Sequence, residues 1–464
     1  MKIIVLGAGQ VGATVAENLA RENNDVTVVD INNDVLAELQ SRMDLRTVHG
    51  HASFPDVLRK AGAEDADMII AATNSDETNI VAMQIAYTLF HTPSKIARIR
   101  SQEYIPHPKA DLNWFDNDHI PINVAISPEL LVRDRLARII EHPGALQVVD
   151  FANGIVRLVG IRVDEGAAMD GKPISELRVL LADRIETRVV AIFRGDDSVE
   201  PKGDTLIQSK DIVFFLGERV HTQTVMALFH QEDSPSRFIV IAGGGNIGFS
   251  LARSLESRYR VKLIERNPDR ASYLAEKLES AMVLVGDAAN HELMVEENVA
   301  DADVFCALTN DDEANILSAM LAKSIGASKV MSLINRNEYV NLVENDIDAI
   351  DVAISPQSIT IGALLTHIRR GDVVAVYSLR KGSAEALEGI AHGDPGSSPV
   401  VGRTIEQLQL PKGATIGAVV RGTQVKIAHH DLEIIAEDHI IVLTVNRAQI
   451  TEVEKLFQVN ATYI

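Results

Sequence analysis

Residues 2–12 read KIIVLGAGQVG. A short apolar run leads directly into glycines spaced as G-x-G-x-x-G, at Gly7, Gly9 and Gly12. In a dinucleotide-binding turn the first glycine permits the tight bend out of a strand, and the second lets a pyrophosphate approach the backbone. The third lets the next helix pack closely against the sheet. This stretch therefore predicts the strand, phosphate-binding turn and helix that begin a Rossmann-type fold.

The glycine pattern occurs twice in the chain. It returns as GGGNIG at residues 243–248, an offset of 236 (243 − 7). The same offset carries Thr73 and Asn74 onto Thr309 and Asn310. A register that holds over polar as well as glycine positions indicates an internal duplication.

Alternating strand and helix patterns indicate an α/β fold with two tandem, doubly wound parallel sheets, each followed by a small β-rich α+β domain. Ser127 and Ser355 are each followed by proline, which predicts the N-cap of a linker helix in each half. Short helices are expected at Ile174–Leu180 and Ile405–Leu410, among the strands of the small domains. The predicted domains are a first Rossmann-type domain at 1–123, a linker helix and small domain at 124–231, a second Rossmann-type domain at 232–352, and a second linker helix and small domain at 353–464.

Composition excludes several classes of function. The chain has 464 residues, of which 46% are hydrophobic, enough for several packed cores. Its net charge of −21 opposes binding to nucleic acid or to anionic lipid. The single cysteine, Cys306, lies in an apolar run, so no intramolecular disulfide is expected and a reducing cytosol fits. No apolar stretch approaches the ~18 residues that span a bilayer.

An acidic residue follows each glycine motif at the end of the next predicted strand. Asp30 comes 18 residues after Gly12 (30 − 12), and Glu265 comes 17 after Gly248 (265 − 248). A carboxylate there accepts hydrogen bonds from ribose hydroxyls and disfavours a 2′-phosphate, so NAD(H) is expected in preference to NADP(H). Arg266, next to Glu265, leaves that preference open for the second site.

The ends of the later strands should border the ligand crevice, because the strand order reverses between strands one and four. Thr73 and Asn74 end the fourth strand. Either they contact the ligand there, or the polar residues at this strand end serve only to cap the next helix, through Ser75. Arg98 ends the fifth strand and can bind a phosphate, whereas the second half has Ile334 there. The two sites are therefore expected to differ.

No catalytic constellation repeats in the two halves. A dehydrogenase needs a proton relay or a substrate clamp near the nicotinamide, and the small domains supply none at repeated positions. His429 and His430 point to opposite faces if they lie on a strand, and no third ligand has fitting spacing. No catalytic residue and no metal site are therefore predicted.

The glycine motifs with their acids, the Thr-Asn strand ends, the Ser-Pro helices and the small β-rich domains together resemble the TrkA family over essentially the full chain. These proteins are peripheral regulatory subunits of Trk-type potassium uptake systems, built from two tandem RCK units. The resemblance implies a homo-oligomer, a tetrameric ring, under a potassium-translocating membrane subunit at the cytoplasmic face of the membrane. It also implies binding of NAD(H) and of ATP or ADP, and gating without turnover.

The motif positions and the resemblance give one set of expected nucleotide contacts in each half. In the first half these are Gly7, Ala8, Gly9, Gln10, Val11, Gly12, Asp30, His51, Thr73, Asn74 and Arg98. In the second half they are Gly243, Gly244, Gly245, Asn246, Ile247, Gly248, Glu265, Asp287, Thr309 and Asn310. His51 stands where the second half has Asp287, which is a further difference in local charge.

Two alternatives to a nucleotide-sensing regulatory subunit remain. An NAD-dependent oxidoreductase with a duplicated fold would oxidise NADH when a small substrate is added. A cytoplasmic scaffold would use nucleotide only to stabilise its fold, and the ligand would then have no effect on potassium flux.

Overall fold

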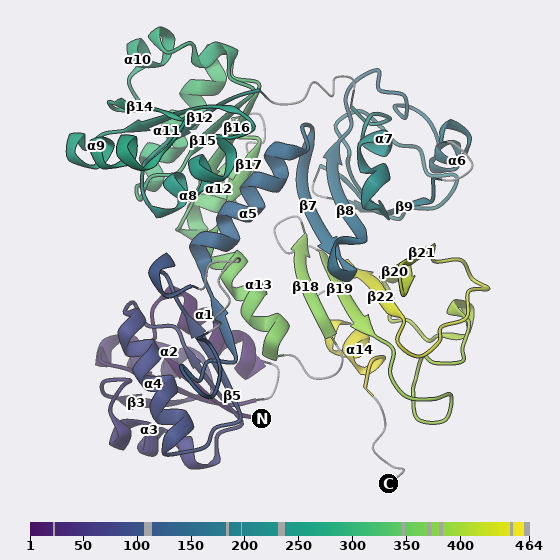
Figure 1. The fold of residues 1–464 in the computed structure, drawn as a ribbon. Helices are drawn as coiled ribbons and strands as arrows, with labels where there is room; N and C mark the ends of the chain where they lie inside the picture. Colours follow the sequence, from purple (N-terminus) through teal and green to yellow (C-terminus); the bar gives the residue numbers. More distant parts are fainter. Residues whose placement is uncertain are drawn as a thin grey trace. The chain divides into compact units, whose positions relative to one another are not determined.

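The computed structural model describes residues 1–21, 24–105, 114–181, 185–195, 197–230, 237–345, 349–368, 373–379, 384–445 and 449–458. The chain forms two compact units (Figure 1). The first unit consists of Met1–Val132 and Ser355–Ile368. The second consists of Arg133–Ile354 and Arg369–Ile464. Within the described residues, no helix combines the length and the apolar composition that a membrane crossing needs.

The first unit is built on a six-stranded parallel sheet with the order β3-β2-β1-β4-β5-β6. This order confirms the predicted Rossmann-type topology. Its elements are β1 (Lys2–Leu6), α1 (Gln10–Arg21), β2 (Asp25–Asp30), α2 (Asn33–Arg42), β3 (Arg46–His49), α3 (Pro55–Ala61), β4 (Met68–Ala71), α4 (Asp76–Thr88), β5 (Ser94–Arg98) and β6 (Val124–Ile126).

Both faces of this sheet are covered. Ile3 and Val5 of β1 pack in one core with α1 and α2, whereas Ile4 and Leu6 pack in another with α3 and α4. Successive side chains of a strand point to opposite faces, so an unbroken apolar strand requires a helical layer on each side.

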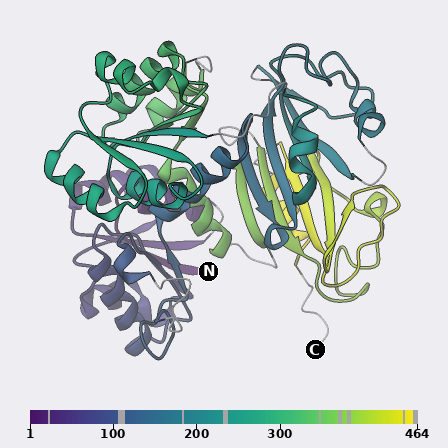
Figure 2. The same cartoon turned by 45° about the horizontal axis from the view of Figure 1, so that its top comes forward.

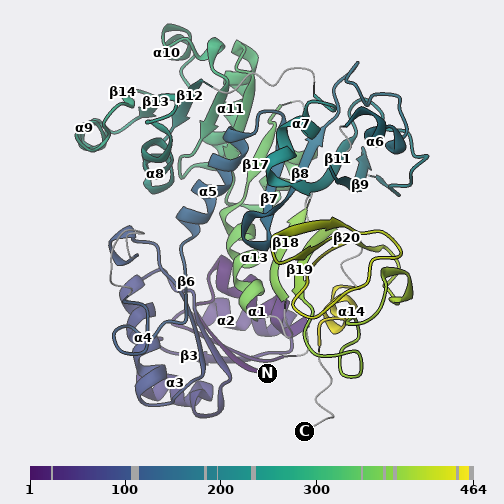
Figure 3. The same ribbon diagram turned by 45° about the vertical axis from the view of Figure 1, so that its right-hand side comes forward.

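A helix from the second half of the sequence completes the first unit. Leu364 of α13 (Pro356–Ile368) is buried in the same core as Ile3 and Val5. The Gln357 side chain donates from Nε2 to Oγ1 of Thr14 on α1, at 2.8 Å. Figure 3 shows α13 beside α1. The second linker helix therefore covers the first Rossmann-type sheet, a surface that the sequence analysis did not assign to it.

The second Rossmann-type domain repeats the first, with the sheet order β14-β13-β12-β15-β16-β17. Cys306, which lies in the apolar run noted above, is fully buried in β15, and burial raises its pKa to about 12. The elements are β12 (Phe238–Ala242), α8 (Asn246–Leu255), β13 (Arg260–Glu265), α9 (Pro268–Lys277), β14 (Met282–Val285), α10 (His291–Glu296), β15 (Val304–Ala307), α11 (Asp312–Ile325), β16 (Lys329–Leu333), α12 (Asn337–Asn345) and β17 (Val352–Ile354).

The two linker helices begin at the predicted prolines, but only one serine caps its helix. Ser355 Oγ accepts from the Ser358 N–H at 3.3 Å. In α5 (Pro128–Glu141) the Ser127 hydroxyl is buried without a hydrogen-bond partner among the described residues. The Ser127 carbonyl still accepts the first helical bond, from Leu131 N–H at 3.0 Å. The side-chain cap predicted for Ser127 is therefore wrong, although the helix boundary is right.

Each small domain contains a five-stranded antiparallel sheet, with the orders β10-β9-β11-β8-β7 and β18-β19-β22-β20-β21. The first has β7 (Ala145–Phe151), β8 (Val156–Arg162), α6 (Leu177–Leu180), β9 (Thr187–Arg194), β10 (Asp197–Val199), β11 (Ile212–Glu218) and α7 (Thr222–Met226). The second has β18 (Val373–Leu379), β19 (Ala384–Ile390), β20 (Ala414–Arg421), β21 (Gln424–Ile427), β22 (His439–Thr444) and α14 (Ile450–Lys455). The short helices appear as 3-10 turns at Ile174–Glu176, which runs into α6, and at Ile405–Gln407.

The two small domains share one hydrophobic core. Phe151 and Phe214 of the first pack in a single cluster with Leu379 of the second. The Ala152 N–H donates to the buried Glu388 carboxylate, at 3.0 Å. Figure 2 shows the two sets of strands gathered into one β-rich body. Each small domain thus packs one apolar cluster against the other, besides the separate core that it forms from its own residues.

An ion pair explains one part of the sequence repeat. Arg194 donates from Nε to the buried Asp211 carboxylate at 2.8 Å, and Arg421 does the same to Asp438 at 2.9 Å. Each arginine also donates to a loop carbonyl, and each aspartate accepts from a loop N–H. The repeated Arg and Asp positions thus hold a loop onto the sheet in each small domain.

Candidate nucleotide-binding sites

The first glycine turn has the geometry that the motif predicts. Gly7 has φ +100°, and its N–H donates to the Val29 carbonyl at 2.8 Å. A Cβ at Gly12 would lie 1.9 Å from the Gly7 carbonyl oxygen, so only glycine lets α1 approach the turn. A Cβ at Gly9 would have no atom of the described residues within 4 Å apart from its chain neighbours. The space in front of Gly9 is open, as a pyrophosphate requires.

The second turn reproduces this geometry. Gly243 has φ +106°, and a Cβ at Gly248 would lie 1.9 Å from the Gly243 carbonyl oxygen. The position of Gly245 is as open, within the described part of the chain, as that of Gly9. The residues that begin the two helices, Gln10 and Val11 in α1 and Asn246 and Ile247 in α8, follow directly. The first amides of a helix have no partner within it and lie at the positive end of its dipole, which suits them to bind phosphate.

Both acidic residues lie against their glycine turns. Asp30 accepts from the N–H of Ala8 at 2.6 Å and from that of Asn32 at 2.8 Å. Glu265 accepts from Gly244 and Asn267 at 2.8 Å each. Each carboxylate is thereby fixed beside the turn, at the edge of the sheet where an adenosine ribose lies in this fold.

An asparagine that the sequence analysis did not single out organises the fourth-strand end. Asn79 is fully buried; its Oδ1 accepts from Thr73 N–H at 3.2 Å and from the Thr73 hydroxyl at 2.6 Å. Its Nδ2 donates to the Arg98 carbonyl at 2.8 Å. Asn315 makes the equivalent bonds to Thr309 and to the Leu333 carbonyl. The persistence of this asparagine in both halves was the sequence feature that could have revealed its role.

A buried aspartate at the start of the fourth-strand helix has a similar role. Asp76 accepts from the backbone N–H groups of Arg100 and Ser101, and Asp312 accepts from those of Asn335 and Arg336. These acids bind the chain after the fifth strand, which the sequence analysis did not predict.

The predicted cap at Ser75 is confirmed, since its Oγ accepts from the Thr78 N–H at 3.1 Å. In the second half Asp311 Oδ1 caps the equivalent helix and accepts from the Ala314 N–H at 3.0 Å. Asn74 and Asn310 are exposed beside these turns. The Thr-Asn pairs thus lie at the carboxyl edge of each sheet, and contact of these residues with a ligand stays a prediction.

Arg98 ends β5, and no described residue forms an ion pair with its guanidinium. Its Nε is buried and has no hydrogen-bond partner among the residues that the structure describes. Burial lowers the pKa of the guanidinium and the neighbouring Arg100 lowers it further, while Glu129 and Asp76 act in the opposite direction. Arg100 itself pairs with Glu129 at 3.0 Å. A partly buried guanidinium with an unused donor is suited to bind an anion.

The predicted pairing of Arg98 with Ile334 is wrong by one residue. Asn79 donates to the Arg98 carbonyl and Asn315 to that of Leu333, and Ile99 and Ile334 occupy the next, equivalent positions. The buried Leu333 therefore stands where the first half has Arg98, and the second half still has no guanidinium there.

His51 Nδ1 lies 2.8 Å from Ser53 Oγ, whereas Asp287 accepts from the Ala289 N–H at 2.9 Å. Both residues follow the third strand, beside the strand that carries the acid.

Comparison with known proteins identifies both kinds of domain. The TrkA-N domain family matches residues 3–111 and 239–356, and the TrkA-C domain family matches residues 158–230 and 395–458. The Trk system potassium uptake protein TrkA of Vibrio alginolyticus is 54% identical over 458 residues and covers 99% of both chains. The protein of the same name from Halomonas elongata is 52% identical over 463 residues and covers 100% of both.

Solved structures share the fold. The crystal structure of the GsuK RCK domain has a TM-score of 0.61 at 19% identity, and covers 98% of this chain and 94% of that one. The GsuK channel bound to NAD has a TM-score of 0.60 at 18% identity, and covers 98% of this chain and 78% of that one. At such identities the likeness concerns the fold.

Proposed function

Because the chain belongs to the TrkA family, we propose that it is the nucleotide-sensing regulatory subunit of a potassium uptake system. Each half binds NAD(H) at its glycine turn, and the first half also binds ATP or ADP through Arg98. Binding gates a membrane potassium-translocating subunit and is not followed by turnover. The relatives named as Trk system potassium uptake proteins, which cover the whole chain, support this proposal.

One observation carries the nucleotide part of the proposal. Both halves keep an open glycine position in front of a helix start, with an acid fixed beside it. A sequence that retained the fold alone would have no need to keep this space open twice. The GsuK channel, which shares the fold, is described as bound to NAD.

The linker helices provide a route from each nucleotide to the other half of the sequence. Gln357 of α13 donates to Thr14 of α1, the helix that begins at the first phosphate turn. In the same way, Arg133 of α5 donates to Ser250 of α8, at 3.5 Å, beside the second turn. A ligand that shifts either helix therefore acts on a linker helix from the other half. Population shifts that correspond to about 1–3 kcal/mol of coupling are sufficient for regulation.

Assembly follows from the family. We expect a homo-oligomer, a tetramer, that lies at the cytoplasmic face of the membrane through its pore partner. The net charge of −21 disfavours direct adsorption to anionic lipid, so the attachment would depend on protein contacts.

Two substitutions test the proposal. Gly9→Asp and Gly245→Asp each place a carboxylate in the open phosphate position of one site, where the described residues leave room for it. We expect each variant to lose one of two NADH sites per chain in calorimetry, because the carboxylate repels the pyrophosphate. Potassium uptake in cells that lack the native chain should then respond less to nucleotide.

The matched control is Gly203→Asp, which makes the same change at an open, exposed position of the first small domain. It should leave both binding and uptake unchanged. If both site variants still bound two NADH molecules, the nucleotide assignment would be wrong. Steady consumption of NADH on addition of a small substrate would favour an oxidoreductase instead.

A further inference from the structure

The second glycine turn carries a guanidinium that the first turn lacks. Arg270 of α9 donates from Nε to the carbonyl oxygen of Gly244 at 2.9 Å. Gly244 in turn donates its N–H to Glu265. Arg270 therefore lies directly at the turn, on the side of the acid that receives the adenosine ribose.

Aromatic side chains support this guanidinium. Its Cζ lies 4.9 Å from the ring centroid of Tyr273 and 6.0 Å from that of Phe249. Cation–π contacts of this kind hold an arginine in one place without consuming its donors. Arginine has five N–H donors, and within the described residues only Nε of Arg270 has a partner. The Nη groups remain available to an anion.

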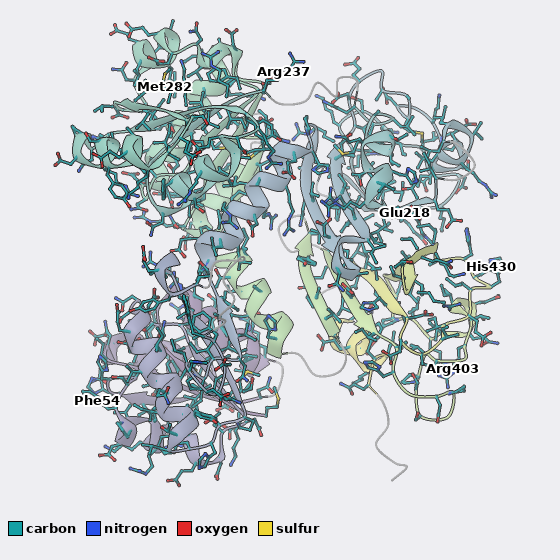
Figure 4. The ribbon with its side chains drawn as sticks, viewed as in Figure 1. Phe54, Glu218, Arg237, Met282, Arg403 and His430 are labelled. Carbon is teal, nitrogen blue, oxygen red and sulfur yellow. The ribbon has the colours of Figure 1, made fainter. Side chains whose placement is uncertain are left out.

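The first half has an apolar surface at the same place. Val35 and Ile31 stand where the second half has Arg270 and Arg266, at an offset of 235 (270 − 35). Ile31 is 66% exposed and Phe54 is 58% exposed. Figure 4 shows Phe54 at the surface of the first unit. The first half therefore has no arginine beside Asp30, and the exposed residue next to this acid is the apolar Ile31.

The charges at the two ribose ends differ accordingly. In the second half Glu265, Asp269 and Asp287 contribute three negative charges, and Arg266 and Arg270 contribute two positive ones; the first half has Asp30 and Asp34 and no arginine at these positions. Both oxygens of Glu265 accept backbone N–H groups, as those of Asp30 do, so the two acids are compensated alike and the arginines make the difference. The second half is thus the less negative of the two, and its Arg270 has Nη groups to which no described residue is bound.

We propose that the second site accepts a phosphomonoester on the adenosine ribose, as in NADP(H), and that Arg270 determines this specificity. The first site excludes such a ligand. The inference rests on the proposed function, since it assumes that the second glycine turn holds a dinucleotide. It resolves, for the second site, the preference between NAD(H) and NADP(H) that the sequence left open.

The test uses the full chain with one site silenced. In the Gly9→Asp chain only the second site can bind a dinucleotide, and in the Gly245→Asp chain only the first can. NADPH, NADH and adenosine 2′,5′-bisphosphate are titrated into each by calorimetry. The second site should bind NADPH at least as tightly as NADH, and should also bind the bisphosphate, which lacks the nicotinamide. The first site should prefer NADH by about tenfold, since a charged hydrogen-bonded pair corresponds to roughly that factor.

Substitution at Arg270 separates specificity from binding. In the Gly9→Asp chain, Arg270→Val gives the second half the residue of the first and should lower NADPH affinity about tenfold, but NADH affinity less than about threefold. Arg270→Lys should restore part of the loss. Arg253→Val removes an exposed arginine from α8 of the same domain and should change neither affinity.

Two failures are distinguishable. A Gly9→Asp chain that binds none of the three ligands would overturn the proposed function of the second half, and this inference with it. A chain that binds NADH but excludes NADPH, or in which Arg270→Val changes both affinities equally, would overturn the inference alone.

Discussion

Single side chains position each site by binding backbone rather than ligand. Asn79 joins the fourth-strand end to the fifth strand, and Asp76 binds the two amides that follow that strand. The polar atoms of these buried side chains are bonded to the backbone, so their substitution would distort the candidate site rather than remove a contact with the ligand. Arg98 differs from them, because no described residue accepts a hydrogen bond from its buried Nε.

Arg98 should distinguish among nucleotides in the first half. A terminal phosphate concentrates charge, so ATP gains more from a guanidinium than NADH does. In a Gly245→Asp chain, which retains the first site, Arg98→Ile should weaken ATP binding about tenfold and NADH binding less than about threefold. Competition of ATP against NADH measures both.

Arg98→Lys is the control, since it retains the charge but not the fork of donors, and it should retain part of the ATP affinity. If the two halves ranked ATP and NADH identically and Arg98→Ile changed neither, the division between the sites would be refuted.

At the residue scale, local patterns were predictable and distant partners were not. The glycine turns and their acids follow from short-range spacing, because strand, turn and helix are contiguous in sequence. The N–H groups that donate to Asp76 lie 24 and 25 residues away, across a strand, so no local pattern indicates them. Arg270 could not be predicted from the repeat, because it aligns with Val35 and a comparison of the two halves reveals only the residues that both contain.

Among the elements, each linker helix bonds to a helix that begins at a glycine turn of the other half. The Ser-Pro pattern predicted where α13 begins, but it does not indicate which surface the helix covers. The structure shows that α13 packs against α1 and in the core that contains β1 of the first half. The Ser127 cap failed for a related reason, since the Ser-Pro pattern fixes where a helix begins and not what its hydroxyl contacts.

Gln357 should affect communication more than binding. Gln357→Ala removes the bond to Thr14, and a neutral hydrogen bond corresponds to roughly a threefold to tenfold change in an equilibrium. NADH affinity of the first site should stay within about threefold of the native value. The nucleotide response of potassium uptake should fall by about threefold to tenfold. Uptake in complemented cells, with calorimetry on the same protein, measures both.

Ser358→Ala is the matched control, because it truncates an exposed side chain one residue further along α13. It should change neither quantity. A normal nucleotide response in Gln357→Ala cells would remove this contact from the proposed route.

For the whole molecule, the expected assembly can be measured directly. Light scattering of the purified chain should give a mass of about four times 50.5 kDa, because the proposed assembly is a tetramer and homo-oligomers usually close with point-group symmetry. Dilution should not release folded monomer. A mass of 50.5 kDa at working concentrations would contradict the ring.

The shared core of the two small domains has a consequence for how the sites diverged. A half-length ancestor would have had to obtain the same packing from a second, identical copy, and any new arginine would have appeared in both copies at once. Covalent fusion removes that constraint, since every chain then carries one partner of each kind in fixed ratio. Arg98 could be lost from one half, and Arg270 could arise in it, without mixed populations of assemblies. Because the two halves are covalently joined, every assembly contains equal numbers of the two different sites.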